Sequence, residues 1–220
     1  MLRMEKQDVV RHPLDDGEIV RRVVEGDTAL FEVLMRRHNQ RLYRAALAIL
    51  GNPDEAEDVV QQAYINAYTH LRQFEGKASF STWLTRIAVH EAYGRLRKRR
   101  PEEPIDDRHE PQSHETIPSI DPERGAINRE LRDALEAEIT ALPEHYRTVF
   151  MMREVEGLST ARTAELLEIS RDVVKTRLKR ARERLRGGLY RRAGVRGNDL
   201  FAFLGERCDR IVAAVFRLIS

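Results

Sequence analysis

Apolar residues recur at every third or fourth position through most of the chain, which is the spacing that places them on one face of a helix. In the first hundred residues this spacing predicts four helices, over 14–25, 27–50, 54–72 and 79–100. Asp27 is expected to cap the second helix, and Ser79 or Ser81 the fourth, while Asp54 is expected to open the third. No segment alternates apolar and polar residues as a half-buried strand does, so the sequence indicates an all-α protein.

The helical spacing continues in the second half of the chain. It predicts helices over 127–142, 143–156, 159–167 and 171–186. Ser159 and Ser170 stand at N-cap positions of the last two helices, and Gly187-Gly188 is expected to stop the final one. These segments predict a second small helical domain over residues 125–188.

A segment of different composition separates the two halves. Residues 101–124 hold five of the eight prolines and carry eight acidic and two basic residues, a net charge of −6. The segment has no sustained apolar spacing, so it buries too little surface to fold alone. We therefore expect an acidic linker between a domain at 14–100 and a domain at 125–188. The linker is interpreted equally well as a soluble spacer or as a mimic of RNA in a basic channel.

Residues 189–220 form a C-terminal extension. Its last part carries apolar residues at helical spacing: Leu200, Phe203, Leu204, Ile211, Val212, Val215, Phe216 and Ile219. We expect a helix here that packs within the protein, on either domain, and binding to a partner is the alternative. Cys208 is expected to be a buried small apolar residue.

Composition excludes several classes of protein. The longest apolar runs are six residues, far below the ~20 that cross a bilayer, and the N-terminus lacks the apolar stretch of a secretion signal. The single cysteine excludes an intramolecular disulfide framework. No Gly-rich phosphate loop, HExxH sequence or nucleophile constellation is present. We expect a cytoplasmic protein with no membrane insertion, no metal, no cofactor and no catalytic residue.

The net charge of +2 hides a strong separation of charge. Residues 95–100 hold five basic residues, and residues 171–186 hold eight basic and two acidic ones. Residues 159–186 also have the layout of a helix-turn-helix, whose second helix enters the major groove of DNA. Basic side chains on that helix reach guanine edges or phosphates. We predict DNA binding here; the alternative is a solvated helix with basic residues near its C-terminal end.

Several sequence blocks resemble bacterial sigma factors. Glu156-Gly157-Leu158-Ser159, Ala164-Glu165-Leu166-Leu167 and Val174-Lys175-Thr176-Arg177-Leu178-Lys179-Arg180 are similar to sigma region 4. Residues 52–64 and 74–88 are similar to sigma region 2. The order of these blocks resembles the extracytoplasmic-function (ECF) type of the sigma-70 family. The resemblance implies two helical domains, binding to core RNA polymerase and to promoter DNA, and an anti-sigma factor as a candidate further partner.

The resemblance assigns candidate residues to three surfaces. Those that would dock on core RNA polymerase are Asp58, Gln61, Gln62 and Asn66. Those that would bind and melt the −10 promoter element are Lys77, Ser79, Phe80, Trp83, Arg86, His90 and Arg95. Those that would bind the −35 element are Ser170, Arg171, Lys175, Thr176, Arg177, Lys179 and Arg180. Phe80 and Trp83 would offer ring faces to unpaired bases, although core packing is the favoured interpretation of Trp83.

The chain departs from the family pattern at two informative positions. Gln62 stands where the family often has Glu, and Glu168 stands where it often has Gly. A tight turn at Glu168 favours a positive φ, which costs a non-glycine residue about 1 kcal/mol. Two rival functions use the same charges: a stand-alone helix-turn-helix repressor, and an interaction protein whose basic helices bind RNA.

Overall fold

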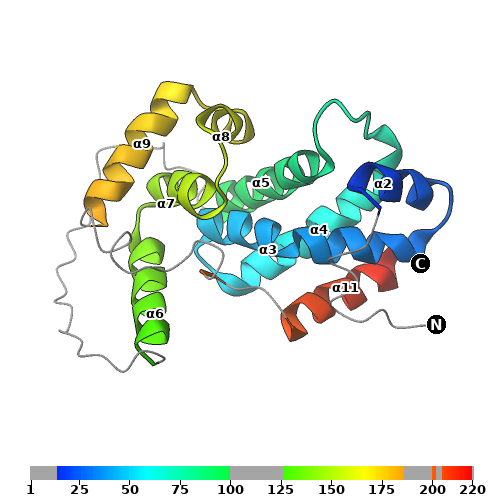
Figure 1. Ribbon diagram of the computed structural model, residues 1–220, viewed down its shortest axis with the longest axis horizontal. Coiled ribbons are helices and arrows are strands. Elements are labelled where there is room, and N and C mark those ends of the chain that lie inside the picture. The colour runs from blue at the N-terminus through cyan, green and yellow to red at the C-terminus, as the bar shows by residue number, and fades with distance from the viewer. Residues whose placement is uncertain (1–13, 100–125, 186–199, 202–204, 220) are drawn as a thin grey trace.

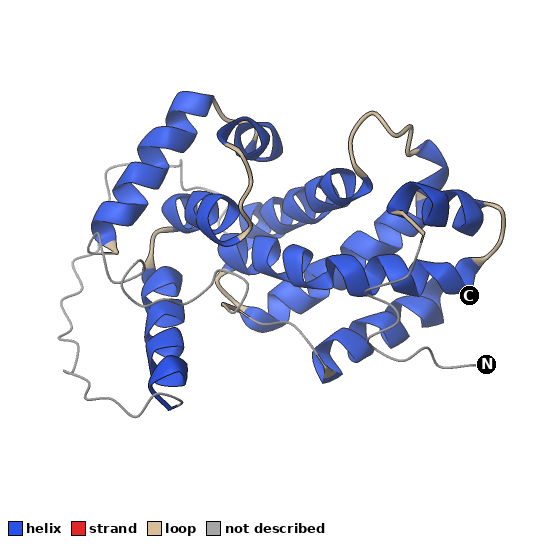
Figure 2. Cartoon of the chain, viewed as in Figure 1, coloured by secondary structure: helices blue, strands red, loops and turns tan. Residues whose placement is uncertain are grey.

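The computed structural model describes residues 14–99, 126–185, 200–201 and 205–219. Within these ranges the regular structure is entirely helical, as Figure 2 shows, so the predicted all-α class is confirmed. The predicted linker at 101–124 and the start of the C-terminal extension lie outside the described residues.

The N-terminal domain contains α2 (Asp16–Val24), a 3-10 turn (Thr28–Leu30), α3 (Phe31–Leu50), α4 (Pro53–Thr69), a second 3-10 turn (Leu71–Gln73) and α5 (Phe80–Arg99). The long helices α3, α4 and α5 pack on one another (Figure 1). Tyr64 is fully buried between them, meets Phe31 edge-on and donates from its hydroxyl to the Met35 carbonyl at 3.0 Å.

Local caps explain where these helices begin. The Asp15 carboxylate accepts from the Glu18 N–H at 2.8 Å at the start of α2, and the Ser79 hydroxyl accepts from the Thr82 N–H at 3.3 Å at the start of α5. Helix α4 begins at Pro53, one residue before the predicted start at Asp54, because the Asn52 side chain accepts from the Asp54 N–H and caps the helix. One expected cap is wrong. Asp27 precedes a 3-10 turn and makes no side-chain cap there.

The C-terminal domain contains α6 (Ala126–Ala141), α7 (Glu144–Phe150), a π-helical turn (Met151–Val155), α8 (Thr160–Leu167) and α9 (Arg171–Arg184). Ser159 and Ser170 cap α8 and α9, each accepting an N–H three residues ahead at 3.2 Å, as predicted. Between the two helices Glu168 has a φ of 55°, which is the left-handed turn that the sequence predicted.

The helix of the C-terminal extension is α11 (Glu206–Ile219). It lies along α3 and α4 of the N-terminal domain (Figure 1), which was one of the placements left open by the sequence. Cys208, Ile211, Val212 and Val215 are buried in this contact. The expectation that Cys208 behaves as a buried residue is thus confirmed, and burial raises the pKa of its thiol.

Candidate functional site

Helix α9 exposes one polar, basic face. Val174, Leu178 and Ala181 are buried against the rest of the domain. The exposed basic and polar side chains are those of Arg171, Lys175, Thr176, Lys179 and Arg180. Lys175 pairs with Asp172 at 3.0 Å along the same exposed surface. Val173 is 36% exposed, whereas the neighbouring Val174 is buried.

Three of the predicted −35 residues are partly buried or hydrogen-bonded within the domain itself. Arg177 is half-buried, and its Nε atom has no hydrogen-bond partner among the described residues. Burial raises the pKa of the Glu144 carboxyl, and the positive charge of Arg177 offsets part of that rise. Arg180 is exposed but donates to the Tyr146 hydroxyl at 3.1 Å. Ser170 is occupied as the N-cap of α9.

The predicted polymerase-docking residues share the surface of α4. Asp58 is exposed, while Gln61, Gln62 and Asn66 are half-buried. The Gln62 amide donates to Asn66 at 3.0 Å, so these side chains are neighbours on one stripe, as their spacing requires. Asp58 also pairs with Arg95 of α5 at 3.4 Å. Members of two predicted surfaces therefore meet here.

The predicted −10 residues do not form one uniform surface. Phe80 is 3% exposed and packs against Phe74 and Trp83, with ring centroids 5.6 and 5.8 Å away. Contrary to expectation, its ring offers no free face in this arrangement. Trp83 is half-buried in the same cluster, consistent with the core-packing interpretation. Lys77 and His90 are exposed, and Lys77 pairs with Glu75.

Helix α8 of the C-terminal domain lies over the start of α5. Arg86, a predicted −10 residue, pairs with Glu165 of α8 at 2.7 Å. Thr82 of α5 accepts from the guanidinium of Arg162, also on α8. Part of the predicted −10 surface is therefore in contact with the first helix of the helix-turn-helix.

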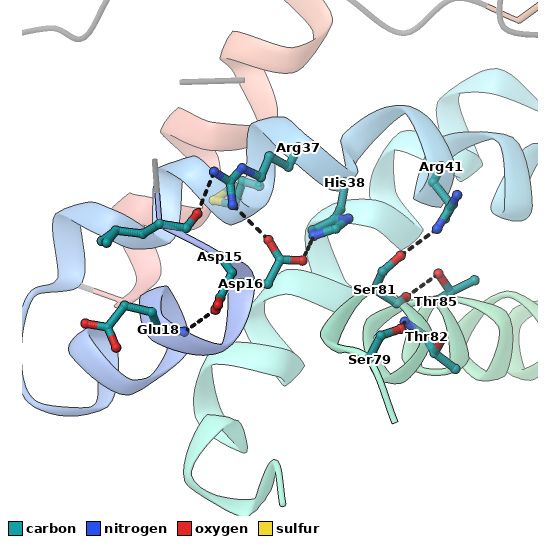
Figure 3. Close-up of polar contacts among 12 residues, drawn as sticks. Asp15, Asp16, Glu18, Arg37, His38, Arg41, Ser79, Ser81, Thr82 and Thr85 are labelled. Atoms are coloured by element: carbon teal, nitrogen blue, oxygen red, sulfur yellow. Dashed lines mark hydrogen bonds and ion pairs between the residues drawn. The ribbon is translucent and has the colours of Figure 1, made fainter. Parts of the chain in front are cut away.

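A buried arginine cluster joins the domains, and the sequence reasoning missed it. Arg44 is 2% exposed and donates to Glu156 at 3.0 Å. Arg41 donates to the other Glu156 oxygen at 3.0 Å and to the Ser81 hydroxyl at 2.7 Å, a contact visible in Figure 3. The available signal was Arg44 itself, a charged residue inside the apolar stretch 42–50. Buried charges are rare unless they are paired.

Two further contacts join α7 to the N-terminal domain. Arg147 donates to the carbonyls of Ala48 and Ile49 at 2.7 and 3.3 Å, which places a cation at the C-terminal end of α3. Gly51 ends α3 with a φ of 68°, and a Cβ there would lie 3.1 Å from the Arg147 guanidinium. Nearby, the Tyr93 hydroxyl donates to Glu144 at 3.0 Å, and burial raises the pKa of that carboxyl.

A separate polar network fastens α2 to α3 at the N-terminal end of the domain. Asp16 accepts from Arg37 at 3.0 Å and contacts the His38 ring at 2.8 Å (Figure 3). The hydrogen bond with His38 is the main cause that lowers the pKa of Asp16. Because the carboxylate satisfies two neighbouring side chains, this network is a structural fastening.

None of the helices in the described ranges combines the length and the apolar character needed to cross a membrane.

Two family models match the chain in order. Residues 34–102 match sigma-70 region 2, and residues 132–185 match sigma-70 region 4. The first match contains the α4 stripe and all of α5, and the second contains the helix-turn-helix of α8 and α9.

Curated relatives resemble the chain over most of their own length. The ECF RNA polymerase sigma factor SigW of Bacillus subtilis is 34% identical over 173 residues, covering 76% of this chain and 92% of the relative. The ECF RNA polymerase sigma-E factor of Escherichia coli is 34% identical over 176 residues, covering 77% and 92%. The RNA polymerase sigma-H factor of Pseudomonas aeruginosa is 33% identical over 174 residues, covering 76% and 90%.

A solved structure shares the fold. CnrH, determined in complex with the cytosolic domain of CnrY, superposes with a TM-score of 0.54 at 23% identity, covering 80% of this chain and 97% of that one.

Proposed function

The chain belongs to the ECF type of the sigma-70 family, and we propose that separate surfaces of its two domains bind core polymerase and the two promoter elements. As a member of this family it binds core RNA polymerase and directs promoter-specific transcription initiation. The domain at 14–100 would supply docking and −10 binding, and the domain at 125–188 would supply −35 binding. The observation that carries this division is the order of two family regions, the second of which ends in an exposed basic helix.

The α4 stripe is the proposed polymerase-docking surface. Asp58 is exposed, and the carboxamides beside it present both donors and acceptors. The Asp58–Arg95 pair does not oppose this role, because Asp58 is exposed and an ion pair open to solvent is worth little and is readily exchanged. Docking would release Arg95 toward promoter phosphates.

Helix α9 is the proposed −35 reader. Lys175, Thr176 and Lys179 are exposed on adjacent turns, so they can face one groove together. Arg177 is the weaker candidate, since its side chain is half-buried. The match to region 2 counts against a stand-alone repressor, which has no use for a polymerase-docking domain.

The proposed role requires no catalytic group from this chain. RNA synthesis would be carried out by the polymerase, while Lys77, Arg86 and Arg95 would hold the promoter strands by charge. The same role places the protein in the cytoplasm, where core polymerase and the chromosome are found.

Paired variants test the division of labour. Asp58→Ala with Gln61→Ala should weaken capture of core polymerase, because both side chains lie on the docking stripe. Lys175→Ala with Lys179→Ala should leave capture unchanged and reduce run-off transcription at least about tenfold, since each lost base contact is worth about 1–3 kcal/mol. Arg217→Ala, an exposed basic position outside both surfaces, is the matched control. Wild-type transcription from both variant pairs would contradict the assignments.

A further inference from the structure

Leu200, Phe201 and α11, together called the C-terminal strap, contact both domains. We propose that this strap holds the domains in a closed arrangement that covers part of the −10 surface, so that its displacement is a regulated step in activation. The proposal rests on the proposed function and adds to it a control element within the same chain.

The first end of the strap bridges the domains through its backbone. The Phe201 N–H donates to Glu136 of α6 at 2.6 Å, and the Phe201 carbonyl accepts from Gln40 of α3 at 2.5 Å. Phe201 has a φ of 50°, an unfavourable conformation for a residue with a side chain. Such conformations persist where surrounding contacts impose them. One residue therefore ties α6 of the C-terminal domain to α3 of the N-terminal domain.

The strap also completes the buried arginine cluster. The Leu200 carbonyl accepts from Arg44 Nε at 2.8 Å, while Arg44 Nη1 binds Glu156. Leu200 is fully buried. A buried guanidinium is tolerated only where its donors are satisfied. Removing the strap would leave Arg44 Nε without its carbonyl and would weaken the contact that Arg44 makes with the C-terminal domain.

Helix α11 anchors the strap on the N-terminal domain by charge and apolar contact. Arg207 and Arg210 pair with Glu57 of α4 at 3.3 and 3.0 Å, and Asp209 pairs with Arg36 of α3 at 2.8 Å. Each of these ion pairs thus joins a charge on α11 to an opposite charge on the N-terminal domain. Glu57 lies one helical turn before Gln61 on α4, so the anchored helix borders the proposed polymerase-docking stripe.

The closed arrangement covers side chains of the proposed −10 surface. It pairs Arg86 with Glu165 and Thr82 with Arg162, so side chains at the start of α5 face α8 instead of promoter DNA. Because the strap is on the same chain, its local concentration is high and no second protein is needed to maintain closure. A competitor for the α11 site, or polymerase at the adjoining stripe, would release it.

Charge reversal in the full-length chain tests the proposal. Arg207→Glu with Arg210→Glu should repel Glu57, detach α11, enlarge the radius of gyration in X-ray scattering and raise run-off transcription on the order of fivefold or more. Adding Glu57→Arg should restore the wild-type radius of gyration and the wild-type yield of run-off transcripts. Arg217→Glu is the matched control, since Arg217 lies on the same helix, is exposed and has no ion pair with the described residues.

A second variant distinguishes loss of the strap contact from misfolding of the chain. Glu136→Ala removes the acceptor of the Phe201 N–H without adding charge to α11, and it should expand the chain in the same direction. An unchanged radius in both variants would overturn the strap, and expansion without increased transcription would overturn its inhibitory role. If no form of the chain gives transcripts, the proposed sigma function fails, while the scattering result still decides whether the strap holds the domains.

Discussion

Glu144 lies at the contact between the two domains, and its negative charge destabilises that contact. It accepts from Tyr93 across the domain boundary at 3.0 Å, yet burial raises its pKa. A raised pKa in the folded state means that the carboxyl contributes stability below its unfolded value, near 4.5, and that this contribution is lost as the pH rises through the folded value. Ionisation of Glu144 therefore weakens the interface in which it lies.

Glu144→Gln should consequently stabilise the protein at pH 7. The amide oxygen can still accept from Tyr93, and no charge is buried, so we expect a gain of about 1 kcal/mol in the free energy of unfolding. The gain should shrink as the pH falls toward 4.5, where the wild-type carboxyl is protonated. Urea unfolding at several pH values measures this, and a gain that is constant with pH would contradict the assigned cause.

At the scale of the element, local chemistry made most helices predictable and tertiary packing decided the exceptions. Ser159, Ser170 and Glu168 behave as their sequence positions predicted, because capping and turn geometry depend on near neighbours. Phe80 was misjudged because helical spacing cannot show that Phe74 and Trp83 close over its ring.

Glu168 gives a direct prediction for the helix-turn-helix. Because its φ is 55°, Glu168→Gly should raise the free energy of unfolding by up to about 1 kcal/mol, whereas Glu168→Ala, which keeps the Cβ, should not. Thermal unfolding of both variants makes the comparison. Equal stability of the two variants would show that the turn does not store backbone strain.

At the scale of the whole molecule, the sequence indicated two domains and their order but not how they meet. The closed arrangement depends on contacts between residues far apart in the chain, such as Arg44 with Glu156 and Arg210 with Glu57. Apart from Arg44, each of these residues resembles an ordinary surface charge in the sequence. Only Arg44, surrounded by apolar residues, hinted that a partner was needed.

The domain contact affects the two proposed DNA surfaces differently. The α9 face stays exposed, while part of the α5 surface is covered by α8. In this arrangement the chain would present the proposed −35 helix before the proposed −10 surface is free. The two activities can therefore be distinguished in one reconstituted system.

Run-off transcription with purified core polymerase and a library of upstream DNA fragments tests the central claim most directly. We predict transcripts that appear only when the protein is added, and start sites that share two upstream elements, of which the distal one loses its effect with Lys175→Ala and Lys179→Ala. Absence of added transcripts, together with absence of polymerase capture by every form of the chain, including the Arg207→Glu and Arg210→Glu variant, would contradict the sigma-factor account.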